Sequence, residues 1–200
     1  LPSTAIIVLA GTFAASAQTG GGTAGAPRPE VVKDLAPTGK LRAAINLGNS
    51  VLAQKDAASG APKGVTVDLA RELGKRAGVP VELITFEAAG KVFEALKAGA
   101  WDVAFLAIDP VRAAEIEFTG PYVVIEGAYV VPADSPLKTN EDVDREGVRV
   151  AVAHNSAYDL YLTRSLKNAK LVRESSGPRV LELFSKDRLE VAAGVKQPIV

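Results

Sequence analysis

The chain has 200 residues, 48% of them hydrophobic, and its Lys plus Arg and Asp plus Glu counts are equal at 23 each. This length and composition can bury a sizeable core in a soluble globular protein. The zero net charge disfavours a nucleic-acid partner. Because the chain contains no cysteine and one histidine, disulfides, thiol nucleophiles, Cys-ligated zinc and His-rich metal sites are excluded, and we expect no cofactor.

The first 17 residues have the features of a clipped signal peptide. An apolar run at 5–10 leads to Ala15-Ser16-Ala17, a small-x-small pattern like a signal-peptidase site. The alternative is a short buried helix. The glycines and prolines that follow predict a flexible linker over 18–36. We therefore expect a protein that is exported to the periplasm.

Residues 37–125 predict a first α/β lobe. The expected order is strand 41–47, helix 66–77, strand 81–86, helix 90–98 and strand 100–108. Apolar residues at three- and four-residue intervals mark the helices. Thr66 is expected to cap the first helix, and Gly78 and Gly99 to end the two helices. The alternation of strands and helices predicts a right-handed parallel sheet.

Residues 126–200 predict a hinge crossover and a second α/β lobe. A long β-rich run at 122–131 is broken at Glu126-Gly127, and a strand interrupted in this way can leave one sheet and enter another. The expected elements after it are strand 148–152, helix 156–167, strand 170–173, helix 178–184 and strand 189–193. The predicted architecture is two α/β lobes joined by an extended crossover.

One arginine is well placed to bind an anion. The nearly unbroken apolar run at 103–108 is typical of a strand buried on both faces of a parallel sheet, and Asp109-Pro110 ends it. Arg112 lies just beyond the carboxyl end of this strand, where ligands bind in open α/β sheets. The alternative is a surface ion pair of Arg112 with Glu115 or Glu117.

Five short motifs follow one another along the chain. They are Gly-Lys-Leu-Arg at 39–42, Gly-Val-Thr-Val-Asp-Leu-Ala at 64–70, Leu-Lys-Ala-Gly-Ala-Trp-Asp at 96–102, Pro-Val-Arg at 110–112 and Phe-Thr-Gly-Pro-Tyr at 118–122. As an ordered set they resemble the solute-binding protein family 3, the periplasmic amino-acid-binding components of ABC importers. The resemblance implies a type II periplasmic-binding-protein fold with a hinged cleft, and a membrane permease as partner.

The resemblance also implies where the ligand binds. Arg112 corresponds to the arginine that pairs with the ligand carboxylate, and the end of its strand adds Ala107. The second lobe is expected to contribute a turn at the start of a helix, formed here by Asn155, Ser156 and Ala157, because amide groups at a helix start can hold an anion. Ser156 can also form a capping box with Asp159, and the two roles can coexist.

Three positions depart from the family pattern. Asp109 stands where most members have Thr or Ser, Val195 lies near the position of the acidic residue that holds the ligand ammonium, and Asn49 replaces a covering aromatic residue. Either Asp109 supplies the negative charge, or the ligand has no ammonium group. The chain stops at Val200, about where family members return to the first lobe, so we expect that the carboxyl-terminal part of the fold is missing.

The leading hypothesis is a periplasmic binder that captures a small carboxylate-bearing ligand, an amino acid or related organic acid, between its lobes and favours their closed state. One alternative is a periplasmic dehydratase acting on a prephenate-like acid, for which Asp109 and His154 are the candidate acids. Another is a ligand-sensing domain. Nothing in the residues separates a sensor from an importer component.

Overall fold

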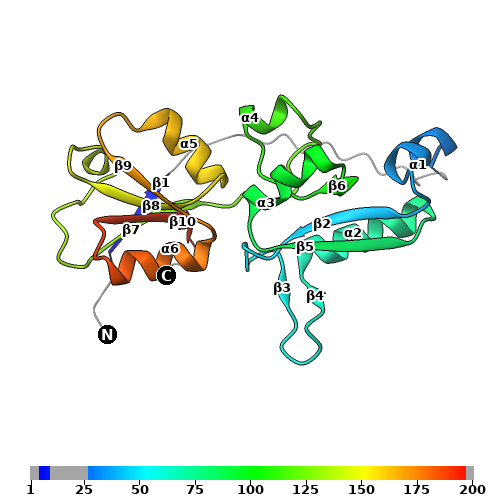
Figure 1. The fold of residues 1–200 in the computed structure, drawn as a ribbon, viewed down its shortest axis with the longest axis horizontal. Helices are drawn as coiled ribbons and strands as arrows, with labels where there is room; N and C mark the ends of the chain where they lie inside the picture. The colour runs from blue at the N-terminus through cyan, green and yellow to red at the C-terminus, as the bar shows by residue number, and fades with distance from the viewer. Residues whose placement is uncertain (1–4, 10–26, 197–200) are drawn as a thin grey trace.

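The computed structural model describes residues 5–9 and 27–196, which form two α/β lobes side by side, joined by an extended segment (Figure 1). The predicted two-lobed fold is therefore confirmed. Of the predicted signal-peptide remnant, 1–17, and linker, 18–36, residues 1–4 and 10–26 lie outside the described residues. Among the described residues, no helix has the length and apolar character needed to cross a membrane.

Lobe 1 is built on a three-stranded parallel sheet in the order β5-β2-β6. Its strands are β2 (Leu41–Asn46), β5 (Val81–Phe86) and β6 (Val103–Ala104), and its helices are α1 (Pro29–Leu35), α2 (Val65–Ala77), α3 (Ala89–Glu94) and α4 (Pro110–Ala113). A 3-10 turn, Ala95–Ala98, continues α3, and β3 (Gln54–Lys55) and β4 (Pro62–Lys63) form a small antiparallel hairpin. The parallel order agrees with the prediction from strand and helix alternation.

Lobe 2 is built on a five-stranded sheet in the order β1-β7-β10-β8-β9. Its strands are β1 (Ala5–Leu9), β7 (Gly127–Val131), β8 (Arg149–Ala153), β9 (Lys170–Glu174) and β10 (Val191–Val195), and its helices are α5 (Ala157–Ser165), α6 (Gly177–Lys186) and a 3-10 turn, Glu141–Val143. Strands β8, β9 and β10 are parallel, whereas β7 runs antiparallel to both β10 and β1.

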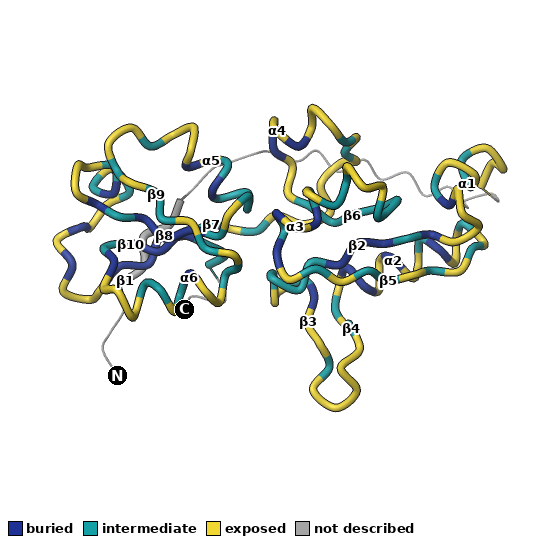
Figure 2. Tube along the Cα trace, in the orientation of Figure 1, coloured by how far each residue is buried: buried dark blue, intermediate teal, exposed yellow. Residues whose placement is uncertain are grey.

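The core of lobe 2 lies on both faces of its sheet. Alternate residues of a strand point to opposite faces, so Val150 and Val152 join a cluster with Leu162 of α5, while Ala151 joins a cluster with Val180 of α6. The two helices cover opposite faces (Figure 1), and the central strands are buried (Figure 2). This double cover explains the apolar runs of the strands.

The core of lobe 1 is smaller. Ala43 and Ile45 of β2 pack with Val67 and Ala70 of α2, while α3 contacts β2 and β5 and buries Val92. Every residue of β5 keeps some exposure. Lobe 1 therefore buries its central strand well and its flanking strands only in part.

The third predicted strand is much shorter than expected. Only Val103–Ala104 pairs with β2, the run at 103–108 is half-buried or exposed, and Ile108 is 56% exposed. The prediction of a strand buried on both faces was wrong, because pairing with β2 ends at Ala104 and the described residues 105–108 form no strand. β6 is an edge strand of the described sheet, so its outer backbone groups have no second strand there to extend the pairing.

The long run at 122–131 also behaves differently from its prediction. Only Gly127–Val131 forms a strand, and the preceding part is an irregular connection between the lobes in which Val124 is 77% exposed. The apolar residues of this part predict a strand, but within the described chain they have no neighbouring strand to pair with. The crossover between lobes is confirmed, whereas its continuous strand is not.

Two helix starts differ from the predictions. Helix α2 is capped by Gly64, and Thr66 instead donates from its hydroxyl to the Leu52 carbonyl at 3.4 Å. Gly64 has a φ of +119°, and a Cβ there would lie 2.6 Å from the same carbonyl oxygen, so only glycine fits. Helix α1 lies within the predicted linker. Pro29 in its first turn and the acidic Glu30 beside it both favour a helix start.

The amino-terminal run at 5–10 had a buried helix as its alternative. The structure has a strand there, β1, paired along the outer side of β7 from Ala5 opposite Val131 to Leu9 opposite Gly127. The helix alternative was therefore wrong. The signal peptide itself stays a prediction.

Candidate functional site

Arg112 lies at the contact between the two lobes and is fully buried, with 0% exposure. It sits in the four-residue helix α4, which Asp109 caps by accepting a hydrogen bond from Val111 N at 2.9 Å. Its Nη1 donates to the Ala107 carbonyl at 3.1 Å, and its Nη2 donates across to the Asn155 carbonyl of lobe 2 at 2.9 Å. The alternative of a surface ion pair is wrong, because this guanidinium is not at the surface.

The guanidinium of Arg112 lacks an anionic hydrogen-bond acceptor among the described residues. Both of its acceptors are neutral backbone carbonyls, and its buried Nε has no hydrogen-bond partner in the described chain. Burial lowers the pKa of Arg112, although the charge of nearby Asp109 opposes that shift. A buried cation without a bonded counterion is costly. The site is therefore electrostatically suited to accept an anion.

Asp109 is engaged by lobe 2. Its side chain is 5% exposed, and its Oδ2 and Oδ1 accept from Arg164 Nη2 at 2.8 Å and Nη1 at 3.4 Å. Arg164 lies in the last turn of α5. The Asp109 carboxylate thus joins the two lobes through an ion pair and also caps α4. Sequence reasoning missed Arg164 because no motif surrounds it and its partner is 55 residues away.

The turn before α5 is tightly fixed. Asn155 has a φ of 54° and donates its backbone N–H to Asp159 Oδ2 at 2.9 Å. The Ser156 hydroxyl oxygen accepts from Asp159 N at 3.2 Å and caps the helix, whose first residue is Ala157. The Ser156 half of the predicted capping box is thus confirmed. The reciprocal half was wrong, because Ser156 N donates to the Ala153 carbonyl and not to Asp159. A role of Ser156 and Ala157 in ligand binding stays a prediction.

The lobes touch closely beside Arg112. A Cβ on Gly90, in the first turn of α3, would lie 2.6 Å from the His154 carbonyl oxygen and 2.8 Å from Asn155 Cβ. The Asn155 side chain also donates from Nδ2 to Glu94 Oε1 at 3.4 Å. Helix α3 therefore packs directly on the same turn that reaches Arg112, and a side chain at position 90 would push the lobes apart. Neither Gly90 nor Glu94 was predicted.

Asn49 lies in a separate part of the lobe boundary. Its Oδ1 accepts from Val51 N at 3.2 Å and so closes its own turn. The neighbouring Gly48 carbonyl would be 3.7 Å from a Cβ on Gly177, at the start of α6. The described structure thus brings together Ala107, Asp109, Arg112 and Asn155 by direct or adjacent contacts, while Asn49 is joined to none of them by a hydrogen bond.

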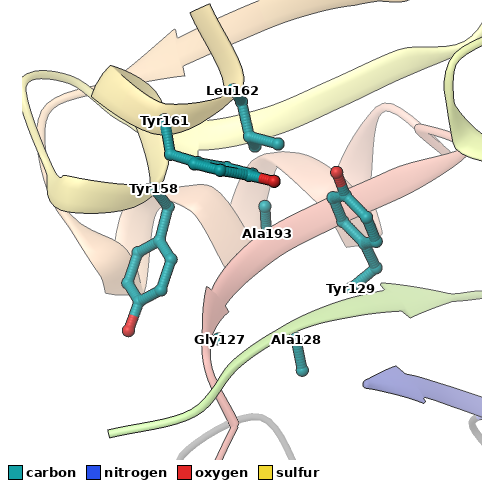
Figure 3. A pocket seen from close by; sticks show the side chains of 7 residues that line it. All are labelled: Gly127, Ala128, Tyr129, Tyr158, Tyr161, Leu162 and Ala193. Carbon is teal, nitrogen blue, oxygen red and sulfur yellow. The ribbon is translucent and has the colours of Figure 1, made fainter. Parts of the chain in front are cut away.

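A small apolar hollow exists elsewhere, in lobe 2 (Figure 3). Its lining residues are Gly127, Ala128, Tyr129, Tyr158, Tyr161, Leu162 and Ala193. None of these is a predicted binding residue, and the lining is almost entirely apolar. Burial raises the pKa of the Tyr158 phenol to about 12. The hollow therefore lacks the charge that an anion-binding site needs.

Two α/β lobes joined by a crossover, with a buried cation at their contact, define a solute-binding protein of the type II periplasmic class. A model of the bacterial extracellular solute-binding proteins, family 3, matches residues 49–197. The chain belongs to this family.

Several solved structures are similar to the chain. An ancestral amino acid-binding protein, a precursor of cyclohexadienyl dehydratase, is 24% identical with a TM-score of 0.70, over 84% of this chain and 75% of that one. A mutant of the arginine-binding protein of T. maritima, bound to arginine, is 22% identical with a TM-score of 0.70, over 83% and 78% of the chains. The cysteine-binding protein of Campylobacter jejuni is 20% identical with a TM-score of 0.70, over 82% and 67%.

At these identities the structural similarities establish the fold. No curated protein sequence matches the chain.

Proposed function

We propose that this protein is a periplasmic solute-binding component of an ABC import system that captures a small carboxylate-bearing ligand, an amino acid or related organic acid, between its lobes. One observation carries the proposal: the fully buried guanidinium of Arg112 has two neutral acceptors and an unpartnered Nε at the lobe contact. A ligand carboxylate would provide the missing counterion.

Ligand entry requires the lobes to separate at the Asn155 carbonyl, which now accepts from Arg112 Nη2. A carboxylate in its place can accept two parallel N–H bonds from Nη2 and Nε, an arrangement stronger than bonds to a neutral carbonyl. The first residues of α5, Ser156 and Ala157, would add amide groups from lobe 2. A ligand held by both lobes favours their closed state over the open one.

The family and its structural relatives support this proposal. Two of the similar structures are named as arginine-bound and cysteine-binding proteins, and the matched family consists of extracellular solute-binding proteins. A permease partner in the membrane and delivery to the periplasm through the predicted signal peptide complete the proposed role.

A dehydratase is the second candidate, because one similar structure is a precursor of such an enzyme. That chemistry needs an acid positioned in the cleft. Asp109 is instead bound to Arg164, and the His154 side chain belongs to an exposed residue. The geometry thus supports a binder better than an enzyme. Turnover of a prephenate-like acid by the purified protein would favour the enzyme over the binder.

The proposal is tested in two steps. A thermal-shift screen over amino acids, keto acids and small dicarboxylates identifies ligands, since binding raises the melting temperature. Calorimetry then compares the wild type with Arg112→Ala. Loss of a charge-assisted bond of about 1.5 to 3 kcal/mol should weaken binding by about one to two powers of ten.

The matched control is Arg71→Ala, which removes an exposed arginine of α2 and should leave affinity unchanged. Equal affinities for wild type and Arg112→Ala would remove Arg112 from the site.

A further inference from the structure

We propose that the ligand is a carboxylic acid that carries no ammonium group, an inference that rests on the proposed function of the Arg112 site. An amino acid enclosed between the lobes brings a carboxylate and an ammonium group, and each enclosed charge is stabilised by a partner of opposite charge. The structure offers a partner for the carboxylate, the guanidinium of Arg112. The acidic side chains that bond the start of α4 or the Asn155 turn are Asp109, Asp159 and Glu94. Each is already bound to a cation of the protein itself.

Asp109 is the most important of these carboxylates. It lies three residues before Arg112, and it is the first-lobe group that could have replaced the family's ammonium-binding acid. Both of its oxygens accept from Arg164, at 2.8 and 3.4 Å, and its Oδ1 also accepts from Val111 N at 2.9 Å. With its side chain 5% exposed, it has little surface left for a ligand cation.

The other carboxylates around the contact are also engaged. Asp159 pairs with Arg173 at 2.8 Å and accepts from Asn155 N and from the Thr163 hydroxyl. Glu94 pairs with Lys91 at 2.9 Å and accepts from the Asn155 side chain. Each acid is therefore matched by one protein cation.

Three further glutamates turn their side chains to the surface. Of these, Glu174 is next to the contact, because its backbone carbonyl accepts from His154 N at 2.7 Å. Glu174 lines a surface hollow with Arg179, Glu182, Leu183 and Lys186 on α6. Glu115 and Glu117, which follow α4, are exposed. None of the three offers a buried partner for an ammonium group.

Among the described side chains that are bonded at the contact, one positive charge is left without a negative partner. The pairs Asp109–Arg164, Asp159–Arg173 and Glu94–Lys91 are each neutral, and Arg112 remains with one positive charge. A singly charged carboxylate cancels this charge. A zwitterionic amino acid would add a second positive group without a counterion, and enclosing an unpaired charge is strongly unfavourable.

The test uses pairs of carboxylic acids in which one member carries an ammonium group and the other carries a hydroxyl group at the same carbon. L-Alanine is compared with L-lactate, L-aspartate with L-malate, L-leucine with its hydroxy acid and L-phenylalanine with phenyllactate, each titrated by calorimetry into the whole chain. At least one hydroxy acid should bind, about tenfold or more tighter than its amino acid partner. An amino acid that binds as tightly as its partner, or tighter, overturns the inference.

Arg112→Ala separates this failure from failure of the proposed function. If an amino acid binds best and its binding depends on Arg112, the inference fails and the proposed function stands. If binding in both series is indifferent to Arg112, or neither series binds, both fail.

A second variant tests the role of Arg164 directly. Arg164→Met removes the cation and frees the Asp109 carboxylate, so it should shift preference toward the amino acid of each pair by about tenfold. Arg164→Lys retains the charge and should keep the wild-type preference. Adding Asp109→Asn to Arg164→Met should abolish the shift. An unchanged preference in Arg164→Met, with an intact circular-dichroism spectrum, overturns the inference.

If Arg164→Met does not fold, Arg164→Gln replaces it, because its amide can still donate to Asp109 without carrying charge. The same shift toward amino acids is expected in this variant, and an unchanged preference would overturn the inference.

Discussion

The two lobes share one plan and differ in how it is covered. Each places its first parallel strand in the middle of three, in the orders β5-β2-β6 and β9-β8-β10. In each lobe an arginine of that strand also forms an ion pair, here called an arginine clamp, with the acidic residue just before the third strand. Arg42 binds Asp102 through its backbone N–H, Nε and Nη2, and Arg149 binds Glu190 in the same three ways.

The cover of the two sheets is unequal. Among the described residues, lobe 2 has buried clusters on both faces of its sheet, whereas lobe 1 has one such cluster against three strands, a contrast that Figure 2 shows along the strands. Lobe 1 nevertheless supplies Arg112 and Asp109, the charged groups of the candidate site. The well-packed lobe 2 thus forms the larger core, and the less covered lobe 1 provides the buried cation of the candidate site.

The largest predicted effect tests the packed core of lobe 2. Leu162 of α5 is 2% exposed and belongs to the main cluster of lobe 2, so Leu162→Ala should lower the free energy of unfolding by about 2 to 5 kcal/mol. Urea denaturation followed by circular dichroism measures it. Leu69→Ala in lobe 1, where the side chain belongs to a residue 38% exposed, is the control and should cost about 0.5 kcal/mol. Equal losses would show that burial in the lobe 2 core does not set the contribution of Leu162.

The two arginine clamps give a matched comparison. Asp102 is 6% exposed and Glu190 is 36% exposed. Burial by itself raises the pKa of Asp102, but the bonds from Arg42 outweigh it and leave the pKa below its usual value. Asp102→Asn should therefore cost about 1.5 to 3 kcal/mol, and Glu190→Gln less than about 1 kcal/mol.

Denaturant titrations of both clamp variants at neutral pH check this order. The reverse order, with the greater loss at Glu190, would show that burial does not set the strength of the clamp.

The contact between lobes is tested at Gly90. Gly90→Ala places a Cβ against the His154 carbonyl, and such overpacking costs about 1 to 3 kcal/mol. In the proposed opening of the lobes, this cost falls on the closed form, so the radius of gyration in small-angle scattering should increase. Gly120→Ala is the control, since nothing lies within 4 Å of its Cβ. An unchanged radius would show that the contact does not hold the lobes together.

The smallest effect concerns high pH. Burial raises the pKa of Tyr158 to about 12, and burial with the nearby Tyr161 and Asp144 raises that of Tyr129 to about 12. The unfolded phenols lose their protons first, near pH 10, so stability is complete below about pH 10 and is lost as the pH rises toward 12. Between pH 9 and 11.5, the melting temperature of Tyr158→Phe should fall by a few degrees less than that of the wild type. Identical slopes would contradict the assignment.

Sequence reasoning predicted most of the fold because periodic patterns are local. The strand at 81–86 and the αL stops at Gly78 and Gly99 agree with the structure. Patterns failed where pairing depends on distant neighbours. The runs at 103–108 and 122–126 are apolar enough for strands, but whether a run becomes a strand depends on a partner that its own residues do not specify.

The candidate site was predicted only in part for the same reason. Arg112, Ala107 and Asn155, all named from the sequence, are joined by hydrogen bonds, since ends of strands and starts of helices can be placed from the chain order. Their binding of a ligand stays a prediction. The partner of Asp109 could not be predicted. Arg164 is far along the chain, and only the folded contact shows that it occupies that carboxylate.

Trp101 is the single tryptophan of the chain, and its indole Nε1 donates to the Val92 carbonyl of α3 at 2.8 Å. The same helix packs through Gly90 against the turn of the opposite lobe. In the proposed separation of the lobes, α3 would lose its contact with that turn, one helix away from the indole. Because the chain has no second tryptophan, Trp101 emission offers a readout of this motion that needs no attached dye.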